Sequence, residues 1–491
     1  MAVASPSHHI WNNALMQALA EKGYNVTVLS PDIETRDIPP TLHYIHAEET
    51  YNTIAKSPNG LNLLGGVDNS AFEESKTPWR FGELGCRGII NSKGFQTLLN
   101  YPDDFHFDAV IYDFTCGPCL LGFVHKFNYP PLIGITAFGT PHYTNDIMGG
   151  HKADAFVPHF ALEYGNDMNI IERFHNVLVH GFDYMYREFI AIPTQDAMMR
   201  EYFPSSPNFG EIERKMRVAL VNTHFSVEYT EPTPPNIIQV GGLQIKKPNI
   251  LPERIKSFIE SSKKGTILFS LGTNMKSELM DDSRKLAFLS AFEQFPDYHF
   301  LWKYESDNLP TKKIPKNVML SPWLDQNSIL AHRNVVAFIT HAGLLSTHEA
   351  VWWGKPMIGI PIFCDQHRNL AKSIHSGIAI KLPYQTISKE TVTEALNEIL
   401  TNEKYTKNAK IRSKLFQDQP QSPLDRAIFW VEWTIRHKDN YTAIESPVKT
   451  LGPFKANMFD MISALALVLV VFAYFLGKYC KNGEKSHVKK D

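Results

Sequence analysis

The chain has 491 residues, 43% of them hydrophobic and 20% charged, which predicts two or three globular domains and excludes a disordered or fibrous protein. Lysine and arginine number 49 against 51 aspartate and glutamate, so the net charge of −2 lacks the basic surplus that nucleic-acid binding needs. Five cysteines are too few for a disulfide scaffold, and their odd number leaves at least one thiol free.

The chain alternates helical and strand-like patterns. Apolar residues at helical spacing predict a helix over residues 10–22, which Gly23 ends, and the apolar run at 26–29 predicts a strand. Further apolar runs bounded by turn residues predict strands separated by helix-like stretches, a pattern typical of parallel sheets buried on both faces. These runs cover residues 109–112, 132–135, 218–221, 266–271, 300–302, 335–339 and 357–360.

A Cys-x-x-Cys motif, Cys116-Gly117-Pro118-Cys119, follows one of the predicted strands. Such a pair is the dithiol of thioredoxin-like proteins, where a helix N-terminus lowers the pKa of the first thiol. No tryptophan precedes the motif, and a chain of this length is an unusual host for a small redox module. We therefore interpret it as small residues in a packed turn. A zinc site would need a second ligand pair, which the sequence lacks.

A proline-rich segment at residues 231–235 is the expected linker between two domains. It divides the chain into an N-terminal domain of residues 1–235 and a C-terminal domain of residues 236–438, in which residues 424–437 are predicted to form a closing helix. A stem at 439–457, a membrane-spanning helix at 458–480 and a basic tail at 481–491 complete the predicted organisation.

The predicted membrane span has no charged side chain from residue 461 to 477 and no polar helical face. With its flanks it is long enough to cross a hydrocarbon core of about 30 Å. Five lysines and two acidic residues follow it, so the positive-inside rule predicts a cytosolic tail and a lumenal body. A lumenal body needs a signal peptide, which residues 1–9 do not resemble. Either the anchor inserts after synthesis with the body cytosolic, or an upstream exon or start codon is missing.

Several common motifs are absent from the sequence. It contains neither the GxGxxG dinucleotide motif nor the GxxxxGK phosphate loop, which argues against a nicotinamide oxidoreductase and a P-loop NTPase. It has no GxSxG motif, which argues against a serine hydrolase. It also has no DxD motif with which a sugar-nucleotide enzyme could hold a divalent metal ion.

The strongest cluster of candidate site residues lies between Trp323 and Asn369. The predicted strand at 335–339 runs into Thr340-His341-Ala342-Gly343, and a helix is predicted to start near Ser346. Small residues after a parallel strand allow the amides of a helix N-terminus to face a pyrophosphate.

Other residues of this cluster suit the rest of a nucleotide. Glu349, about one turn into the helix, would reach a ribose diol, and Trp323 could stack on a base. Asp365 and Gln366 follow the next strand, where the ligands of open α/β sheets gather. Each residue taken alone could equally be an ordinary core or surface residue, but the ordered set predicts a nucleotide site.

These segments closely resemble the signature of the UDP-glycosyltransferases, a family that includes vertebrate UDP-glucuronosyltransferases and insect and plant UDP-glucosyltransferases. The resemblance covers essentially the whole chain: Ser7-His8 followed by a helix and Gly23, DAVIYD at 108–113, VGGL at 240–243, FSLG at 269–272, and the C-terminal anchor. The sequence THAGLLSTHEA at 340–350 looks most like insect members. Leu345 stands where relatives commonly have asparagine, so no asparagine contact to phosphate is expected.

The resemblance implies an α/β fold with two Rossmann-like domains, the GT-B arrangement, followed by a C-terminal transmembrane helix. The acceptor would bind to the N-terminal domain and the donor to the C-terminal one. His8 matches the catalytic base, with His9 as the second choice, and Asp113 matches the carboxylate that orients it. For the UDP-sugar, the resemblance implies that Trp323 stacks on uracil and that Gln326 and Glu349 contact the ribose. The diphosphate contacts would be Thr273, His341 and Ser346, beside the small residue Gly343. Asp365 and Gln366 would hold the sugar.

The chemistry of an inverting sugar transfer agrees with these roles. An acceptor hydroxyl is a poor nucleophile near neutral pH, and a histidine whose tautomer is fixed by a carboxylate is a suitable general base. The charge that develops on the leaving diphosphate can be stabilised by His341, by hydroxyls and by a helix N-terminus. No metal ion or other cofactor is therefore expected, because the UDP-sugar is itself a co-substrate.

UDP-glucose is the expected donor. Glucuronosyl members are expected to place a basic residue in the proline-rich linker, where this chain has Glu231, and no Lys or Arg lies between Arg217 and Lys246. UDP-glucuronate is the alternative donor. The acceptor is expected to be a small lipophilic hydroxyl compound, as in detoxification. The enzyme is expected to be a single-pass protein of the endoplasmic reticulum membrane, in contact with membrane lipid. A homo-oligomer is possible, and the sequence leaves the oligomeric state open.

The start of the chain suggests a further alternative. The family pattern includes a signal peptide and a central first strand before the histidine, where this chain has only Ala2-Val3-Ala4. We therefore expect the sequence to be an incomplete gene model. A catalytically silent UDP-sugar-binding or interaction protein is the corresponding alternative function.

Overall fold

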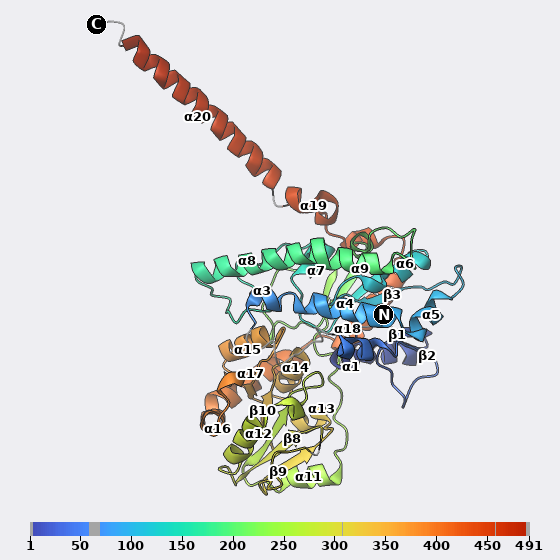
Figure 1. Ribbon diagram of the computed structural model, residues 1–491, viewed down its shortest axis with the longest axis vertical. Coiled ribbons are helices and arrows are strands. Elements are labelled where there is room, and N and C mark those ends of the chain that lie inside the picture. The colour runs from blue at the N-terminus through green and yellow to red at the C-terminus, as the bar shows by residue number, and fades with distance from the viewer. Residues whose placement is uncertain (1–2, 58–68, 307, 457, 488–491) are drawn as a thin grey trace.

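The computed structural model describes residues 3–57, 69–306, 308–456 and 458–487. Two α/β units lie one above the other in Figure 1, and a long C-terminal helix projects from the top of the upper, N-terminal unit. Residues 488–491 of the expected basic tail lie outside the described residues.

The strands of the N-terminal unit form two separate parallel sheets. One pairs β1 (Val26–Ser30) with β2 (Leu42–His46), and the other contains β3 (Val110–Asp113), β4 (Leu132–Thr136), β5 (Val218–Val221) and β6 (Ile237–Gln239) in that order. The predicted strands of this half are confirmed to within two residues. The sequence did not predict β2, because its alternating Leu-His-Tyr-Ile-His pattern has no continuous apolar run and is half exposed.

Helix α1 (Pro6–Glu21) begins four residues before the predicted start. Proline suits the first turn of a helix, where its missing N–H would have no partner. His8 therefore lies within the first helical turn. The other helices of this unit are α2 (Thr50–Lys56), α3 (Ala71–Glu74), α4 (Thr77–Ile90), α5 (Lys93–Leu99), α6 (Gly122–Lys126), α7 (Tyr143–Met148), α8 (Ile170–Tyr186), α9 (Ile192–Met199) and α10 (Phe209–Glu213).

The C-terminal unit is built on one six-stranded parallel sheet. Its strand order is β12 (Ala379–Lys381), β11 (Met357–Gly359), β10 (Val335–Thr340), β7 (Gly265–Ser270), β8 (Tyr298–Lys303) and β9 (Val318–Ser321). Alternate residues of β7 and β10 enter two different hydrophobic clusters, so the sheet is buried on both faces as predicted. The helices are α11 (Glu253–Glu260), α12 (Asp282–Phe292), α13 (Gln326–Ala331), α14 (Leu344–Trp352), α15 (Gln366–His375), α16 (Lys389–Thr401) and α17 (Glu403–Gln417).

The chain passes between the two units twice. β6 follows the proline-rich segment yet pairs with β5, so the first crossing comes after Gln239 rather than at the expected boundary after residue 235. The second crossing is made by α18 (Pro423–Arg436), which was predicted at 424–437. Ala427, Ile428 and Val431 of α18 share a hydrophobic cluster with Trp11 and Leu15 of α1, so this helix packs against the N-terminal unit.

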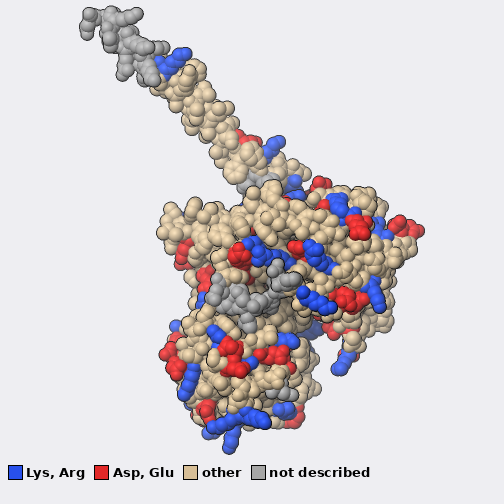
Figure 2. Space-filling view, in the orientation of Figure 1, with Lys and Arg blue, Asp and Glu red and all other residues tan. Residues whose placement is uncertain are grey.

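The chain ends in α19 (Val448–Ala456) and α20 (Phe459–His487). Residues Phe459–Tyr479 of α20 have a mean hydropathy of 2.4 and none of them is buried against the protein. Figure 2 shows this part of α20 as an almost uncharged rod. Its length and composition fit a membrane anchor.

Cys119 forms a disulfide with Cys86 of α4, whereas Cys116 and Cys364 are free and buried. The two cysteines of the Cys-x-x-Cys motif are therefore not each other's partners. The redox interpretation of the motif is not supported, because its two sulfur atoms have different environments.

Candidate active site between the two units

A cleft of about 850 Å³ lies between the two units and is lined by both. Its walls include the start of α1 and the segments that follow β7, β9, β10 and β11, because the carboxyl ends of parallel strands meet at one edge of a sheet. Ten of the eleven expected site residues line it: His8, Thr273, Trp323, Gln326, His341, Gly343, Ser346, Glu349, Asp365 and Gln366. The eleventh, Asp113, lies behind His8.

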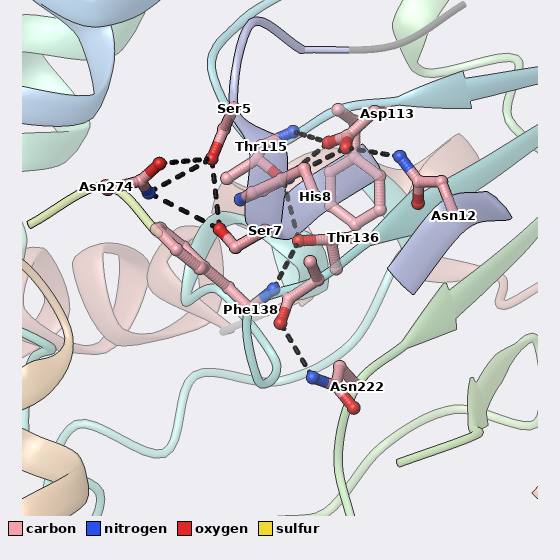
Figure 3. Close-up of polar contacts among 12 residues, drawn as sticks. Ser5, Ser7, His8, Asn12, Asp113, Thr115, Thr136, Phe138, Asn222 and Asn274 are labelled. Atoms are coloured by element: carbon pink, nitrogen blue, oxygen red, sulfur yellow. Dashed lines mark hydrogen bonds and ion pairs between the residues drawn. The ribbon is translucent and has the colours of Figure 1, made fainter. Parts of the chain in front are cut away.

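His8 and Asp113 form a buried pair on the N-terminal side of the cleft (Figure 3). Nδ1 of His8 lies 2.8 Å from Oδ2 of Asp113, the last residue of β3. With Nδ1 occupied by the carboxylate, Nε2 is the nitrogen left to accept a proton from a substrate. The edge of the Phe138 ring packs against the imidazole, with the ring centroids 5.3 Å apart.

The carboxylate of Asp113 is held by three further donors. Nδ2 of Asn12 donates to Oδ2 at 3.0 Å, and the hydroxyl and backbone N–H of Thr115 donate to Oδ1 at 2.6 and 3.2 Å. Burial by itself would raise the pKa of Asp113, but the charge and hydrogen bond of His8 and the bonds from Thr115 and Asn12 outweigh it and lower the pKa. Asp113 is therefore an ionised carboxylate that fixes the His8 ring.

His9 does not line the cleft. Its Nε2 lies 3.3 Å from Glu34. Consecutive helical residues point about 100° apart, so only one of the two histidines can face Asp113.

The N-terminus of α14 opens into the cleft on the opposite side. Gly343, Leu344, Leu345 and Ser346 all line the cleft there, in the first turn of the helix or directly before it. The first amides of a helix have no partner within the helix and carry partial positive charge, so this turn suits an anionic group.

The ring of His341 is enclosed by two glycines. A Cβ atom on Gly272 would lie 2.6 Å from the ring, and one on Gly343 would lie 2.4 Å from Nε2. Burial, with a smaller contribution from Lys303, lowers the pKa of His341 to about 4. The imidazole is therefore neutral at neutral pH, so His341 can donate a hydrogen bond to a diphosphate but brings no positive charge.

Gln326 and Glu349 form a second polar pair. Nε2 of Gln326 donates to Oε2 of Glu349 at 2.9 Å and to the hydroxyl of Ser346 at 3.1 Å. Burial raises the pKa of Glu349 to about 7. Trp323, which is 65% exposed, presents an accessible aromatic surface in the same part of the cleft.

Asp365 and Gln366 lie at the start of α15. Oδ2 of Asp365 accepts a hydrogen bond from Asn369 at 2.9 Å, and burial raises the pKa of Asp365 to about 6. Oε1 of Gln366 accepts from the backbone N–H groups of Ile362 and Phe363, so its Nε2 is left for another partner. Positive charge on the His8 side of the cleft would lower the pKa of Asp365, so a proton taken up there would favour the ionised form of Asp365.

Two loops that enter the cleft hold a non-glycine residue in the left-handed region. Ala342 after β10 has φ of 64° and Cys364 after β11 has φ of 58°. The backbone N–H of Cys364 donates to Glu74 of the N-terminal unit at 2.5 Å. Such conformations persist only where surrounding contacts enforce them, and they cluster at ligand sites.

Sequence reasoning missed two residues that line the cleft and two that lie behind it. Asn12 and Thr115 hold Asp113, Asn274 contacts Ser5 and Ser7 from the opposite unit, and the amine of Lys303 bonds Glu305 and the carbonyl of Gly272. Asn12 lies four residues after His8, a spacing that puts both on one face of α1, but the predicted helix began only at residue 10, so this signal was not available from the sequence.

Comparison with known proteins places this chain among sugar transferases. Residues 3–491 match the family model described as "UDP-glucoronosyl and UDP-glucosyl transferase". The chain is 30% identical to UDP-glucosyltransferase 2 of Dactylopius coccus over 97% of this chain and 91% of that protein. It is 31% identical to UDP-glucuronosyltransferase 2B15 of Rattus norvegicus over 88% of this chain and 83% of that protein.

Two solved glycosyltransferases share the fold. The glycosyltransferase of kitacinnamycin has a TM-score of 0.57 at 15% identity, covering 88% of this chain and 97% of that one. The calicheamicin glycosyltransferase CalG4 has a TM-score of 0.56 at 16% identity, covering 89% and 97%. These likenesses confirm the GT-B arrangement expected from the sequence. The chain belongs to the UDP-glucuronosyl and UDP-glucosyl transferase family and is a UDP-sugar-dependent glycosyltransferase.

Proposed function

We propose that this enzyme transfers glucose from UDP-glucose to a hydroxyl group of a small lipophilic acceptor, with inversion at the anomeric carbon. The observation that carries the proposal is the His8–Asp113 pair, which faces the same cleft as the nucleotide-type residues of the C-terminal unit. Nε2 of His8 would take the acceptor proton as the oxygen attacks, and the Asp113 carboxylate would stabilise the imidazolium that forms.

The N-terminal wall of the cleft supports a lipophilic acceptor. Its side chains are mostly apolar and line the same cleft as His8: Val3, Ile10, Ile54, Pro78, Phe81 and Phe138. Aromatic and aliphatic walls favour ligands with a large apolar surface, while a single polar group at the base fixes their orientation.

The leaving diphosphate would be stabilised without a metal ion. The amides at the N-terminus of α14, the hydroxyls of Thr273 and Ser346 and the neutral imidazole of His341 are all hydrogen-bond donors at the cleft. We expect activity to persist in EDTA, which a requirement for a divalent ion would contradict.

The charges beside Asp365 support glucose over glucuronate. A small pocket next to it is lined by the acidic residues Asp154, Glu228 and Glu231. Its cations are Lys152 and Arg368, and Arg368 is paired with Glu228 at 3.4 Å. Burial raises the pKa values of Glu228 and Glu231. Because negative charge is already disfavoured in this pocket, the additional carboxylate of a glucuronate would be disfavoured there too. UDP-glucuronate is the second candidate donor, and the guanidinium of Arg368 is the observation in its favour.

The deciding experiment uses the full chain in membranes with UDP-glucose or UDP-glucuronate and a panel of phenols. We expect faster transfer from UDP-glucose and a β-glucoside product detected by NMR. His8→Ala and Asp113→Asn should lower kcat by about 100-fold or more. His9→Ala is the matched control and should keep most of the activity. Full turnover by both site variants would refute His8 as the base, and UDP binding without any turnover would favour a catalytically silent protein.

We further propose that α20 anchors the enzyme in the endoplasmic reticulum membrane with the body in the lumen. The Cys86–Cys119 disulfide fits an oxidising compartment. Asn440 of the sequon Asn440-Tyr441-Thr442 is exposed in the stem. Loss of an N-glycan on Asn440→Gln would support the lumenal orientation, whereas a body digested by protease in sealed microsomes would contradict it.

A further inference from the structure

Helix α8 buries its polar face and exposes its apolar face, the reverse of an ordinary surface helix. Its apolar side chains point to solvent, with Ile171 76% exposed, Phe174 65% and Met185 54%. Its buried positions are mainly polar and include Asn176, His180 and Asp183. The helix is amphipathic, but the face that a water-soluble protein would bury is the one left uncovered.

Hydrogen bonds of the buried polar face hold α8 in this orientation. Asn176 accepts from the backbone N–H of His159 at 2.8 Å and donates to the carbonyl of Val157 at 3.0 Å. Asp183 accepts from Nε1 of Trp79 at 2.6 Å and lies 3.0 Å from Nε2 of His159. Rotating α8 to bury its apolar face would break these bonds and leave buried polar partners unsatisfied.

The outward face is continuous and almost uncharged. Among residues 170–190, which the structure describes completely, Arg173 is the one charged residue at an exposed position. The exposed apolar side chains recur every three or four residues over the helix and the turn that follows it: Ile170, Ile171, Phe174, Val177, Leu178, Phe182, Met185, Phe189 and Ile190. A contiguous apolar surface of this length marks contact with a membrane or another protein.

The position of α8 favours the membrane. Figure 1 shows α8 on the same end of the body as α19 and α20, and the corresponding edge in Figure 2 is largely free of charged atoms. Exposed apolar side chains continue through α19 to the anchor at Leu451, Phe454, Met458 and Phe459. The apolar surface of α8 therefore faces the side on which a bilayer crossed by α20 would lie.

We propose that α8 lies in the interface of the bilayer that α20 spans, with its apolar face among the acyl chains. This rests on the proposed anchoring by α20 and adds a second, lateral contact. An amphipathic helix of 17 residues, about 26 Å long, can lie in the interface plane with its apolar face buried in the acyl boundary. Two contacts would fix the orientation of the body more firmly than the single connection through the stem.

The test separates the two contacts. A protease-cleavage sequence is inserted between α19 and α20, the full chain is reconstituted in phosphatidylcholine vesicles, and the anchor is then cut. We expect the wild-type body to float with the vesicles in 0.5 M NaCl after cutting. The variant Ile171→Glu/Phe174→Glu/Leu178→Glu should leave at least tenfold less body on the vesicles.

Controls make each outcome decisive. Ile250→Glu/Ile411→Glu/Leu415→Glu replaces exposed apolar residues of the C-terminal unit and should be retained like the wild type. Thermal unfolding should show that both triple variants are folded. Release of the wild-type body, equal retention of the α8 variant, or retention by native membranes but not by protein-free vesicles would overturn the proposal. An intact chain that fails to join vesicles would instead refute the α20 anchor.

Discussion

Nδ2 of Asn274 in the C-terminal unit lies 3.2 Å from the hydroxyl oxygen of Ser5 in the N-terminal unit, three residues before His8 (Figure 3). The same amide lies 3.4 Å from the hydroxyl of Ser7. Asn274 follows Thr273 directly, so one short loop lines the donor side of the cleft and also bonds the segment that presents the catalytic base.

Replacing Asn274 should therefore weaken the closure of the cleft. We expect Asn274→Ala to lower kcat/KM by about 10- to 30-fold, because two hydrogen bonds of about 1 kcal/mol each are lost and every 1.4 kcal/mol corresponds to about tenfold. Steady-state kinetics with UDP-glucose measures the effect. Asn397→Ala on the exposed face of α16 is the control. Equal kinetics for the two variants would show that the bridge has no part in turnover.

Glu349 should make stability depend on pH. Burial raises its pKa to about 7 from 4.5, so between these values the folded chain holds a proton that the unfolded chain has lost. The unfolding free energy from this group therefore rises as pH falls from 8 towards 5. Glu349→Gln removes the buried charge and should stabilise the protein by about 3 kcal/mol at pH 8 and by less than about 1 kcal/mol at pH 5.

Calorimetric unfolding at the two pH values measures this difference. Glu394→Gln, at an exposed position of α16, is the control and should show no such change with pH. A Glu349→Gln effect of the same size at both pH values would mean that Glu349 does not titrate in this range.

A side chain at position 343 should displace the His341 ring. The Cβ of Gly343→Ala would lie 2.4 Å from Nε2 of His341, which is too close for any contact, so the ring must move. Misplacing a positioned group by about 1 Å can cost about 100-fold in rate, and we expect a loss of this order in kcat/KM. Gly181→Ala, whose Cβ would meet nothing within 4 Å, is the matched control and should leave the kinetics unchanged.

The Cys86–Cys119 disulfide should stabilise the N-terminal unit. It closes a loop across a sequence separation of 33, for which the loss of unfolded-state entropy corresponds to about 3–4 kcal/mol. Cys119→Ala should lower Tm and abolish its sensitivity to dithiothreitol. Cys116→Ala should keep that sensitivity, because Cys116 is not part of the bond. Identical behaviour of the two variants would contradict the pairing.

The local pattern of the chain was sufficient for much of the fold. The strands at 218–221 and 335–340 are continuous apolar runs that are buried on both faces, so composition alone revealed them. β2 and the domain boundary were harder to predict from the sequence. A short, half-exposed strand has no distinctive pattern, and the pairing of β6 with β5 depends on a contact that the proline-rich segment does not encode.

The candidate site shows the same division. Motifs were sufficient to name residues, and ten of the eleven named lie around one cleft. They were not sufficient to find Asn274 or Lys303, because these residues have no motif of their own and matter through contacts with distant segments. The motif also could not predict the protonation state of His341, because the low pKa of this side chain comes from its burial in the folded protein.

The sequence by itself determined the family, the parallel α/β character and the apolar C-terminal helix, because these depend on local runs of residue types and on motif spacing. The tertiary structure decided which histidine meets Asp113, how Asn274 joins the two units and which face of α8 remains uncovered. Each of these three relationships depends on contacts between segments that are distant in the chain and on burial from water. The local pattern of residue types specifies neither the contacts nor the burial.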